Sequence, residues 1–231
     1  CVESAVDELE ELAPRVPREV IVNGVDVAEV EALVPAPDPE RLVFTFAGYF
    51  FGDRRPTAFL DALERLVAER PDLAGRLRAR FLGGFPDADR VRVEAGSLRD
   101  VVALEGTRPH GEALQAQVDA GCLLLFMQDG GGEGAKFVPA KVREYLAAAR
   151  PVLALVPPDG AAATMLRDHA TAWIAAPEDV EACLAALREI AARWTAGTLA
   201  GRPLDPALRD GIDRRAGAAR LAGLIRRTVG G

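Results

Sequence analysis

The residues best suited to chemistry lie at the start of a predicted helix, where Lys141 and Glu144 stand three positions apart. This spacing places both side chains on one face of a helix. The first N–H groups of a helix have no partner within it and carry partial positive charge, so they can hold phosphate. Together with a lysine and a carboxylate that accepts bonds from ribose hydroxyls, they would suit a nucleotide diphosphate. A second interpretation stays open, in which Glu144 complements the helix dipole and Lys141 pairs with it on the surface.

The segment 136–158 supplies the elements that would position these side chains. Apolar residues recur at helical spacing after Pro139 or Ala140, which stands near the first helical position. Pro151 ends this helix, because proline lacks an N–H and disfavours a helical residue before it. The apolar run at 152–156 then predicts a strand buried on both faces. The segment is typical of one half of a parallel α/β unit.

A second group of candidates lies in the loop 48–56, between a predicted strand at 42–47 and a helix. Gly48 would let the backbone approach a ligand closely, and Arg54 and Arg55 stand at the helix start. Arginine is the side chain best matched to phosphate, although solvated loop arginines explain either one alone equally well. The loop does not follow G-x-G-x-x-G, so the nicotinamide-type fingerprint is absent.

Three further motifs give weaker signals. Asp87 and Asp89 form a D-x-D that binds a metal in some sugar-transferring enzymes, but the position before a helix favours a cap. The loop 106–111 carries His110, which could contact a base or sugar or simply be exposed. The glycines of 129–134 fit either close approach to a ligand or disorder.

Composition is that of a globular protein: 231 residues, 49% hydrophobic and 27% charged. A net charge of −7 and a pI of about 5.0 argue against a nucleic-acid partner. No apolar run approaches the roughly 20 residues that span a membrane. Cys1, Cys122 and Cys183 form no C-x-x-C pair, so we expect neither a zinc site nor a disulfide framework, but two buried thiols at Cys122 and Cys183 in a reducing cytoplasm.

The ends of the chain give less regular predictions. A capping box predicts a short helix that ends near Leu12, and residues 19–22 read as a strand that closes on a tight turn at Asn23-Gly24, with a positive φ at Gly24. A long helix is expected from Pro177 to Trp194, and one or two helices over 205–228. The chain begins with neither Met nor a basic region, so we expect no signal peptide and a start within a longer protein.

Strands and helices alternate about six times along the chain. This pattern predicts the α/β class, with a Rossmann-like doubly wound parallel sheet of about six strands and helices on both faces. Such sheets bind ligands at the carboxyl ends of their strands, at the switch point. The loops after Ala47, Leu104 and Met127, and the helix from Ala140, could converge on one crevice there.

The stretch 139–154, PAKVREYLAAARPVLA, gives the chain a resemblance to the C-terminal half of a family 4-like (group 1) glycosyltransferase of the GT-B fold. Such proteins often carry P-x-K-x-x-E-Y-L-A, then a basic residue, proline and an apolar strand. Residues 20–26 resemble the segment that opens this half, 44–55 its first strand and phosphate loop, and 216–225 its closing helix. The resemblance covers almost the whole chain, and 139–154 is its most specific part.

The resemblance implies a donor site for a nucleotide-diphosphate sugar, with no metal and no other cofactor. Glu144 would accept from ribose hydroxyls, fixed cations and the helix N-terminus would neutralise the diphosphate, and the loop around His110 would lie near the base. The implied catalytic cations are Arg54, Arg55 and Lys141, and the implied donor-binding residues are Gly48, His110, Glu133, Phe137, Pro139, Ala140 and Glu144.

The resemblance also implies a domain plan and partners. Residues 1–18 would be a linker helix from a missing N-terminal domain, 19–195 the nucleotide-sugar-binding domain, and 196–231 a C-terminal helical extension. The missing domain would hold the acceptor, a sugar, lipid or small molecule, so a hexosyl-type transferase is implied whose fragment is inactive alone. A cytoplasmic protein is expected, with peripheral attachment to the inner face of the membrane through the missing domain left open.

One position departs from the family pattern. Many relatives carry a second glutamate eight residues before the ribose glutamate, where this chain has Lys136. Glu133 could substitute only if the loop shifts, which leaves sugar-hydroxyl recognition and the retaining or inverting outcome open. The main alternative is a non-catalytic nucleotide-sugar-binding or regulatory module. An epimerase, which would need more acid/base groups than His110 and His169, and a plain structural domain rank lower.

Overall fold

Six parallel strands form one sheet in the order β3-β2-β1-β4-β5-β6. This computed structural model describes residues 20–52, 54–128 and 134–229. The order confirms the predicted doubly wound, Rossmann-like sheet, because it runs outward in both directions from β1 and β4. The strands are β1 (Leu42–Ala47), β2 (Leu77–Leu82), β3 (Val102–Gly106), β4 (Cys122–Phe126), β5 (Val152–Leu155) and β6 (Ala172–Ala175).

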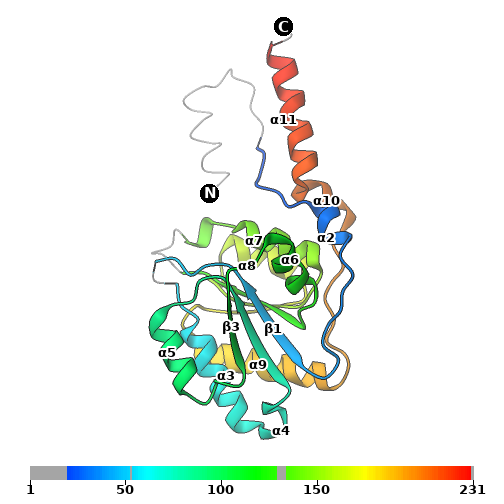
Figure 1. The fold of residues 1–231 in the computed structure, drawn as a ribbon. Coiled ribbons are helices and arrows are strands. Elements are labelled where there is room, and N and C mark those ends of the chain that lie inside the picture. The colour runs from blue at the N-terminus through cyan, green and yellow to red at the C-terminus, as the bar shows by residue number, and fades with distance from the viewer. Residues whose placement is uncertain (1–19, 53, 129–133, 230–231) are drawn as a thin grey trace.

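Helices cover both faces of the sheet, in two layers (Figure 1). Helices α6, α7 and α8 lie on one face, while α3, α5 and α9 lie on the other. A short α2 packs on α7, and α11 projects away from the sheet at the end of the described chain. The helices are α2 (Val27–Glu31), α3 (Thr57–Glu69), α4 (Pro71–Ala74), α5 (Asp87–Ala95), α6 (His110–Val118), η2 (Gly134–Lys136), α7 (Ala140–Ala148), α8 (Ala161–His169), α9 (Val180–Thr195), α10 (Pro206–Ile212) and α11 (Arg214–Val229).

Two apolar cores lie on the two faces of the sheet. Six buried phenylalanines fill much of the core beneath α3 and α9, whereas aliphatic residues and Tyr145 dominate the one beneath α6, α7 and α8. All four residues of β5 are buried, as predicted from its uninterrupted apolar run. Cys122 and Cys183 are buried thiols, also as predicted, and burial raises the pKa of Cys183 to about 12.

The predicted strand at 19–22 is wrong over the described residues 20–22, which are irregular. Gly24 also differs from its prediction, because it does not take a positive φ. A methyl group added at Gly24 would lie 2.5 Å from the backbone nitrogen of Arg214 and 2.6 Å from the carbonyl oxygen of Ile212. The glycine is therefore needed for close contact with the C-terminal segment, where Val25 forms a parallel bridge to Asp213. The short helix predicted to end near Leu12 lies outside the described residues.

Several helix ends differ from the sequence predictions. His110 is the first residue of α6 and not part of a loop. Helix α9 begins after Asp179, whose carboxylate accepts from the N–H of Ala182, and Pro177 precedes it. Helix α7 begins at Ala140, as predicted, and ends one residue before Ala149, which takes a left-handed conformation with φ of 53°. Helices α2 and α4, each five residues or shorter, were not predicted.

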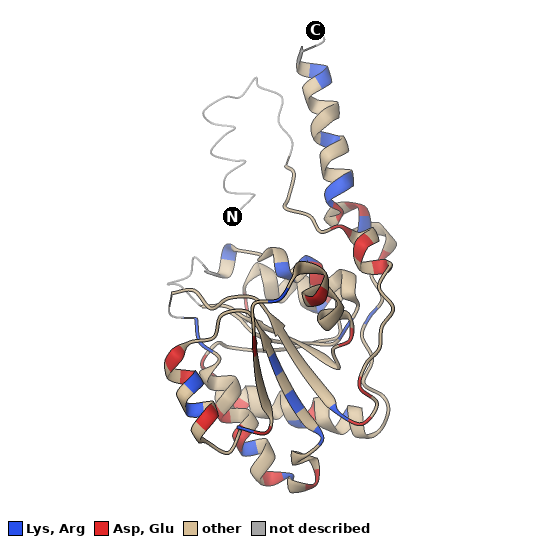
Figure 2. Ribbon diagram, in the orientation of Figure 1, with Lys and Arg blue, Asp and Glu red and all other residues tan. Residues whose placement is uncertain are grey.

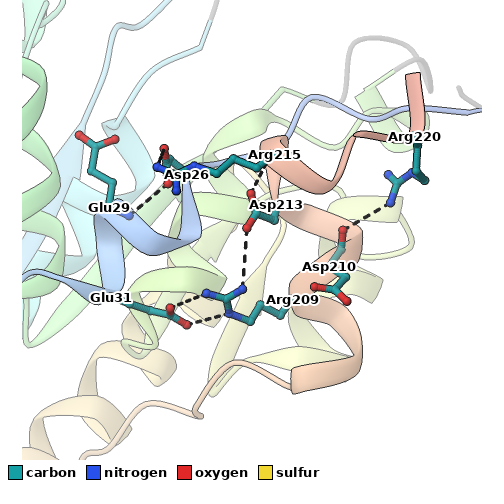
Figure 3. Close-up of polar contacts among 8 residues, drawn as sticks. All are labelled: Asp26, Glu29, Glu31, Arg209, Asp210, Asp213, Arg215 and Arg220. Atoms are coloured by element: carbon teal, nitrogen blue, oxygen red, sulfur yellow. Dashed lines mark hydrogen bonds and ion pairs between the residues drawn. The ribbon is translucent and has the colours of Figure 1, made fainter. Parts of the chain in front are cut away.

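Helices α2, α10 and α11 meet in a group of charged side chains that we call the Asp26 cluster (Figure 3). Arg214 and Arg215 each lie 2.9 Å from the Asp26 carboxylate, and Arg209 forms two hydrogen bonds with Glu31. The cluster consists of Asp26, Glu29, Glu31, Arg209, Asp213, Arg214 and Arg215, and it joins the two ends of the described chain. Basic residues continue along α11 (Figure 2). Among the described helices, none has both the length and the apolar character needed to cross a membrane.

Candidate functional site

The predicted site residues gather around the carboxyl ends of β1 and β4, where the winding of the sheet reverses. The loop that follows β1 begins with Gly48, and the segment after β4 leads to α7. Ligands of doubly wound sheets bind at such a reversal point. The fold therefore brings Gly48 and the first turn of α7 to the place where a ligand is expected.

Lys141 reaches from α7 to the end of β1. Its ammonium donates a hydrogen bond to the Ala47 carbonyl oxygen and lies 5.8 Å from the centre of the Phe46 ring. Burial lowers the pKa of Lys141 below its usual value, and the nearby charge of Arg54 lowers it further, while that of Glu144 raises it. The structure thus holds a partly buried ammonium against a neutral carbonyl and an aromatic ring.

Gly48 makes room for this ammonium. A methyl group added at Gly48 would lie 2.9 Å from Nζ of Lys141. The N–H of Gly48 donates to the Leu82 carbonyl at 2.7 Å, which fixes the turn against β2. Gly48 was predicted to let the backbone approach a ligand, and the group that comes close in this structure is the Lys141 side chain.

Helix α7 is fixed in place by Tyr145, which is fully buried and donates from its hydroxyl to the Leu124 carbonyl of β4 at 2.8 Å. One position earlier, Glu144 points towards α6 and accepts from the Gln117 amide at 3.3 Å. Lys141 and Glu144, both described residues, form no direct ion pair, so the surface pair considered above does not exist. The charge of Glu144 still acts on Lys141, but each side chain forms its hydrogen bond with a different partner.

The N-terminus of α7 is formed by Pro139 in the cap position and Ala140 as the first helical residue, as predicted. Among the described residues, no side chain caps this end of the helix. Phe137, two residues earlier, is 52% exposed. Backbone N–H groups, an ammonium and an exposed ring thus lie within five residues of one another.

Arg54 and Arg55 line a cavity of about 900 Å³ at the same end of the sheet. Burial lowers the pKa of Arg54. Arg55 is more exposed, and its Nε donates to Asp89 at 2.7 Å, an ion pair that raises the pKa of Arg55. The cavity is lined by Arg54, Arg55, Thr57, Ala58, Asp61, Met127, Gln128, Ala176, Pro177, Glu178, Asp179 and Val180.

The ion pair with Arg55 also corrects the prediction for the D-x-D motif. Pro86, not an aspartate, occupies the cap position of α5, and no side chain of the described residues caps that helix. Asp89 is buried and faces Arg55 instead. Three or more metal-binding side chains do not cluster anywhere in the part of the chain that the structure describes.

The predicted residues form two groups with one link. Arg54 and Arg55 share the cavity, whereas Lys141 and Glu144 do not line it. Arg54 belongs to both groups, because it lines the cavity and its charge acts on Lys141. His110 stands apart, since its exposed ring lies 3.9 Å from a Glu29 carboxylate oxygen of α2.

Other residues at the site were not predicted. Gln117 bonds Glu144, and Gln128 and residues 176–180 line the cavity. Of these residues, only Gln128 could have been suspected from the sequence, because it stands just after a buried strand. Glu133, which was predicted to bind the donor, lies outside the described residues.

Comparison with solved structures identifies the fold. An E. coli trehalose-6-phosphate structure bound with UDP-2-fluoro glucose matches 89% of this chain with a TM-score of 0.59 and 16% identity. Sucrose-phosphate synthase from Thermosynechococcus elongatus matches 98% of it, with a TM-score of 0.59 and 16% identity. WaaG, a glycosyltransferase involved in lipopolysaccharide biosynthesis, matches 93%, with a TM-score of 0.62 and 14% identity. No family model and no curated protein matches the sequence.

These neighbours are GT-B glycosyltransferases, and the match confirms the predicted fold of a GT-B C-terminal domain. The chain spans about half the length of the structures it matches, with 51%, 57% and 56% of the three covered. At this level of identity the comparisons establish the fold, and the chemistry must be argued from the side chains.

Proposed function

We propose that this chain is the donor-binding half of a glycosyltransferase that takes a sugar from a nucleotide-diphosphate sugar. The observation that carries the proposal is the Lys141 ammonium, held beside Gly48 at the start of α7, with Glu144 one turn further along the helix. This arrangement lies at the switch point of a sheet with a GT-B fold. Among the described residues, the ammonium contacts a neutral carbonyl and a ring, neither of which neutralises its charge, so it can attract an anion.

The proposed roles follow the charge that develops during transfer. The bond between the sugar and the diphosphate breaks, and negative charge grows on the departing diphosphate. The acceptor hydroxyl oxygen bonds to the sugar carbon, and its proton passes to an oxygen of that diphosphate. Lys141 and the first N–H groups of α7 would stabilise that charge, together with Arg54. Because these groups are already fixed, they would favour the transition state over the ground state. We propose that these protein cations take the place of a metal.

Glu144 would hold the ribose. Its carboxylate already accepts a bond from the Gln117 amide, which orients it towards α6. A carboxylate can accept several hydrogen bonds at once, so two ribose hydroxyls could donate to the remaining positions. We further propose that the transferred sugar is a hexose, and that transfer to an acceptor requires a second domain, so that this half is inactive alone.

Calorimetric titration of the folded chain with UDP- and GDP-sugars tests the proposal. We expect saturable binding at micromolar to millimolar donor, weakened most in Lys141→Met and less in Glu144→Gln. Val91→Ala is the matched control, since Val91 is an exposed residue of α5 away from the site. If folded protein binds none of these donors at millimolar concentration, the proposal is wrong.

A non-catalytic nucleotide-sugar-binding module is the second candidate, and one residue favours it. Lys136 occupies the position where the family pattern places a second glutamate, and it ends the short helix η2 just before α7. A basic residue there would not serve as an acceptor for sugar hydroxyls. The two candidates differ in a longer protein that contains the second domain: a transferase would transfer sugar from the bound donor and lose that transfer in Lys141→Met, whereas a binding module would bind the donor without any transfer.

A further inference from the structure

The exposed aromatic side chains of the described residues all lie near the candidate site. They are Tyr49, Phe51 and Phe137, which are 45%, 68% and 52% exposed. Tyr49 and Phe51 follow β1 directly, and Phe137 precedes α7. The other described aromatic side chains are at least partly buried. An exposed ring costs free energy in water unless a ligand or partner covers it, so their placement calls for an explanation.

Tyr49 is held in a fixed orientation. Its hydroxyl lies 2.8 Å from Oγ1 of Thr107, in the segment between β3 and α6. Its ring packs directly on backbone, because a methyl group added at Gly84 would lie 2.8 Å from Cδ1 of the tyrosine. The ring therefore bridges the loops that follow β1, β2 and β3, and little entropy remains to be lost when a ligand binds to it.

Phe51 extends this surface. Its ring centre lies 6.0 Å from that of Tyr49, and the two planes are inclined by 35°. The residue between them, Phe50, points the other way and packs into the core against Phe46. Two neighbouring rings thus stay outside while the intervening ring anchors the loop, an alternation that presents Tyr49 and Phe51 on one surface.

The family resemblance gave the base contact to the loop around His110. The His110 ring is exposed and lies near Glu29 of α2. The other side of the same segment, at Thr107, is where Tyr49 is bonded. Tyr49, the residue after Gly48, therefore supplies an aromatic ring beside the β3–α6 segment.

We propose that Tyr49 and Phe51 bind the flat face of the donor base, and that this aromatic platform, not His110, contributes the base affinity. The inference rests on the proposed function, because it takes the diphosphate to lie at Lys141 and Gly48. Tyr49 follows Gly48 directly, and its hydroxyl bonds to Thr107 in the β3–α6 segment, beside which the family resemblance places the base. Bases stack on aromatic side chains irrespective of their identity, so the platform accepts purines and pyrimidines alike.

The test compares probes that carry a base with one that does not. Calorimetry would measure the affinities of UDP, GDP, UDP-glucose and inorganic pyrophosphate for the wild-type chain, Phe51→Ala, Tyr49→Ala and the control Val91→Ala. We expect Phe51→Ala and Tyr49→Ala to weaken UDP and GDP about tenfold, with no change for pyrophosphate or for the control. Tyr49→Phe, which keeps the ring, should retain most of the affinity, and His110→Ala should change none of the affinities.

Each other outcome has a distinct meaning. If UDP binds the wild type and both variants equally, the platform does not hold the base, and the proposed donor function stands. If Phe51→Ala weakens UDP-glucose but not UDP, the rings contact the transferred sugar, and the inference is overturned. If the folded wild type binds neither nucleotide nor pyrophosphate, the proposed function fails, and the inference fails with it. Circular dichroism of each variant establishes that the fold is intact.

Discussion

Charged side chains concentrate in two regions of this molecule, and they are organised in opposite ways. In the Asp26 cluster, each of the three arginines faces a carboxylate, with contacts as short as 2.6 Å between Arg209 and Glu31. Figure 3 draws the contacts of two of them, Arg209 and Arg215. At the carboxyl end of the sheet, Lys141 faces a backbone carbonyl and a ring, and Glu144 faces an amide. The first region neutralises its charges internally, whereas the second leaves charge that a ligand can use.

This difference separates a structural charge cluster from a ligand site when residue types alone do not. Both regions lie at helix ends and contain basic residues beside carboxylates. Arg55 shows the distinction within the site itself, since its pairing with Asp89 resembles the Asp26 cluster more than it resembles Lys141. We therefore expect the effect of a substitution to depend on the partner of the side chain and not on its distance from the cavity. Substitution of a charge paired with an opposite charge should change stability, and substitution of a charge without such a pair should change ligand affinity.

Lys141→Met should have the largest effect. It removes the one ammonium at the switch point while it keeps an apolar chain of similar length in contact with Phe46. A hydrogen bond to a charged group contributes about 1.5–3 kcal/mol, so the affinity for a nucleotide-diphosphate sugar should fall by roughly tenfold to a hundredfold. Calorimetry measures the donor affinity of this variant. An unchanged affinity in a folded variant would contradict the view that Lys141, unlike the arginines of the Asp26 cluster, serves a ligand.

The wild-type site should also show a pH dependence set by Lys141. Its pKa is lowered, chiefly by burial, so the ammonium loses its proton at a lower pH than an exposed lysine would. Donor affinity should therefore fall as the pH rises through a value below 10.5. Binding measured between pH 7 and pH 10 checks this, with Lys141→Arg as the control that keeps its charge over that range.

Gly48→Ala should have an intermediate effect. The added methyl group would lie 2.9 Å from Nζ of Lys141, and the flexible end of the lysine can move to avoid it. We expect the ammonium to be displaced and donor affinity to fall by a few fold to about tenfold, with the fold retained. Gly106→Ala is the comparison variant, because its surroundings are open and its effect should come from backbone strain at a φ of 67°. Equal losses of affinity in the two variants would contradict a specific role for Gly48.

Asp26→Asn should lower stability without changing ligand binding. Burial alone would raise the pKa of Asp26, but the N–H of Glu29 and the guanidinium groups of Arg214 and Arg215 lower it below 3.8. A lowered folded-state pKa stabilises the protein above the usual value near 3.8, and this contribution is lost as the pH falls through the lower value. We expect Tm to fall by about 2–4 °C at pH 7, with a difference from wild type that shrinks as the pH falls through the lowered pKa. Weaker donor binding in this variant would show that the two regions are coupled.

Arg209→Gln should have the smallest effect. Arg209 and Glu31 are 36% and 48% exposed, so solvent screens their attraction. Differential scanning fluorimetry should show a change in Tm of less than about 1 °C. A drop as large as that of Asp26→Asn would show that the exposed pairs of the Asp26 cluster contribute as much as the buried carboxylate.

Most of the sheet could be predicted from the sequence. Strands buried on both faces have short uninterrupted apolar runs, whereas the helices of this chain have apolar residues at helical spacing. The runs at β1 and β5 are examples, and each was placed to within one residue. Contacts between distant segments could not be predicted. Gly24 looked like a turn residue because its contact with Arg214 lies almost 200 positions away in the sequence.

The candidate site was predictable where one helix carries it and uncertain where loops combine to form it. The spacing of Lys141 and Glu144 on α7 was sufficient to place both near the switch point. The partners of these residues were not visible, since Gln117, Ala47 and Asp89 belong to other elements. The exposure of Tyr49 and Phe51 was also hidden, because aromatic residues after a strand are as typical of a core as of a binding surface.

Nitrogen-15 NMR of the lysine ammonium groups would test the role of Lys141 most directly. The sequence contains two lysines, Lys136 and Lys141, so Lys136→Arg and Lys141→Met assign both signals. We expect the Lys141 signal to shift as UDP- or GDP-sugars are added, with its pKa raised by the bound diphosphate, while the signal of Lys136 changes little. A Lys141 signal that stays constant at millimolar donor, in protein shown to be folded, would contradict a diphosphate site at the start of α7.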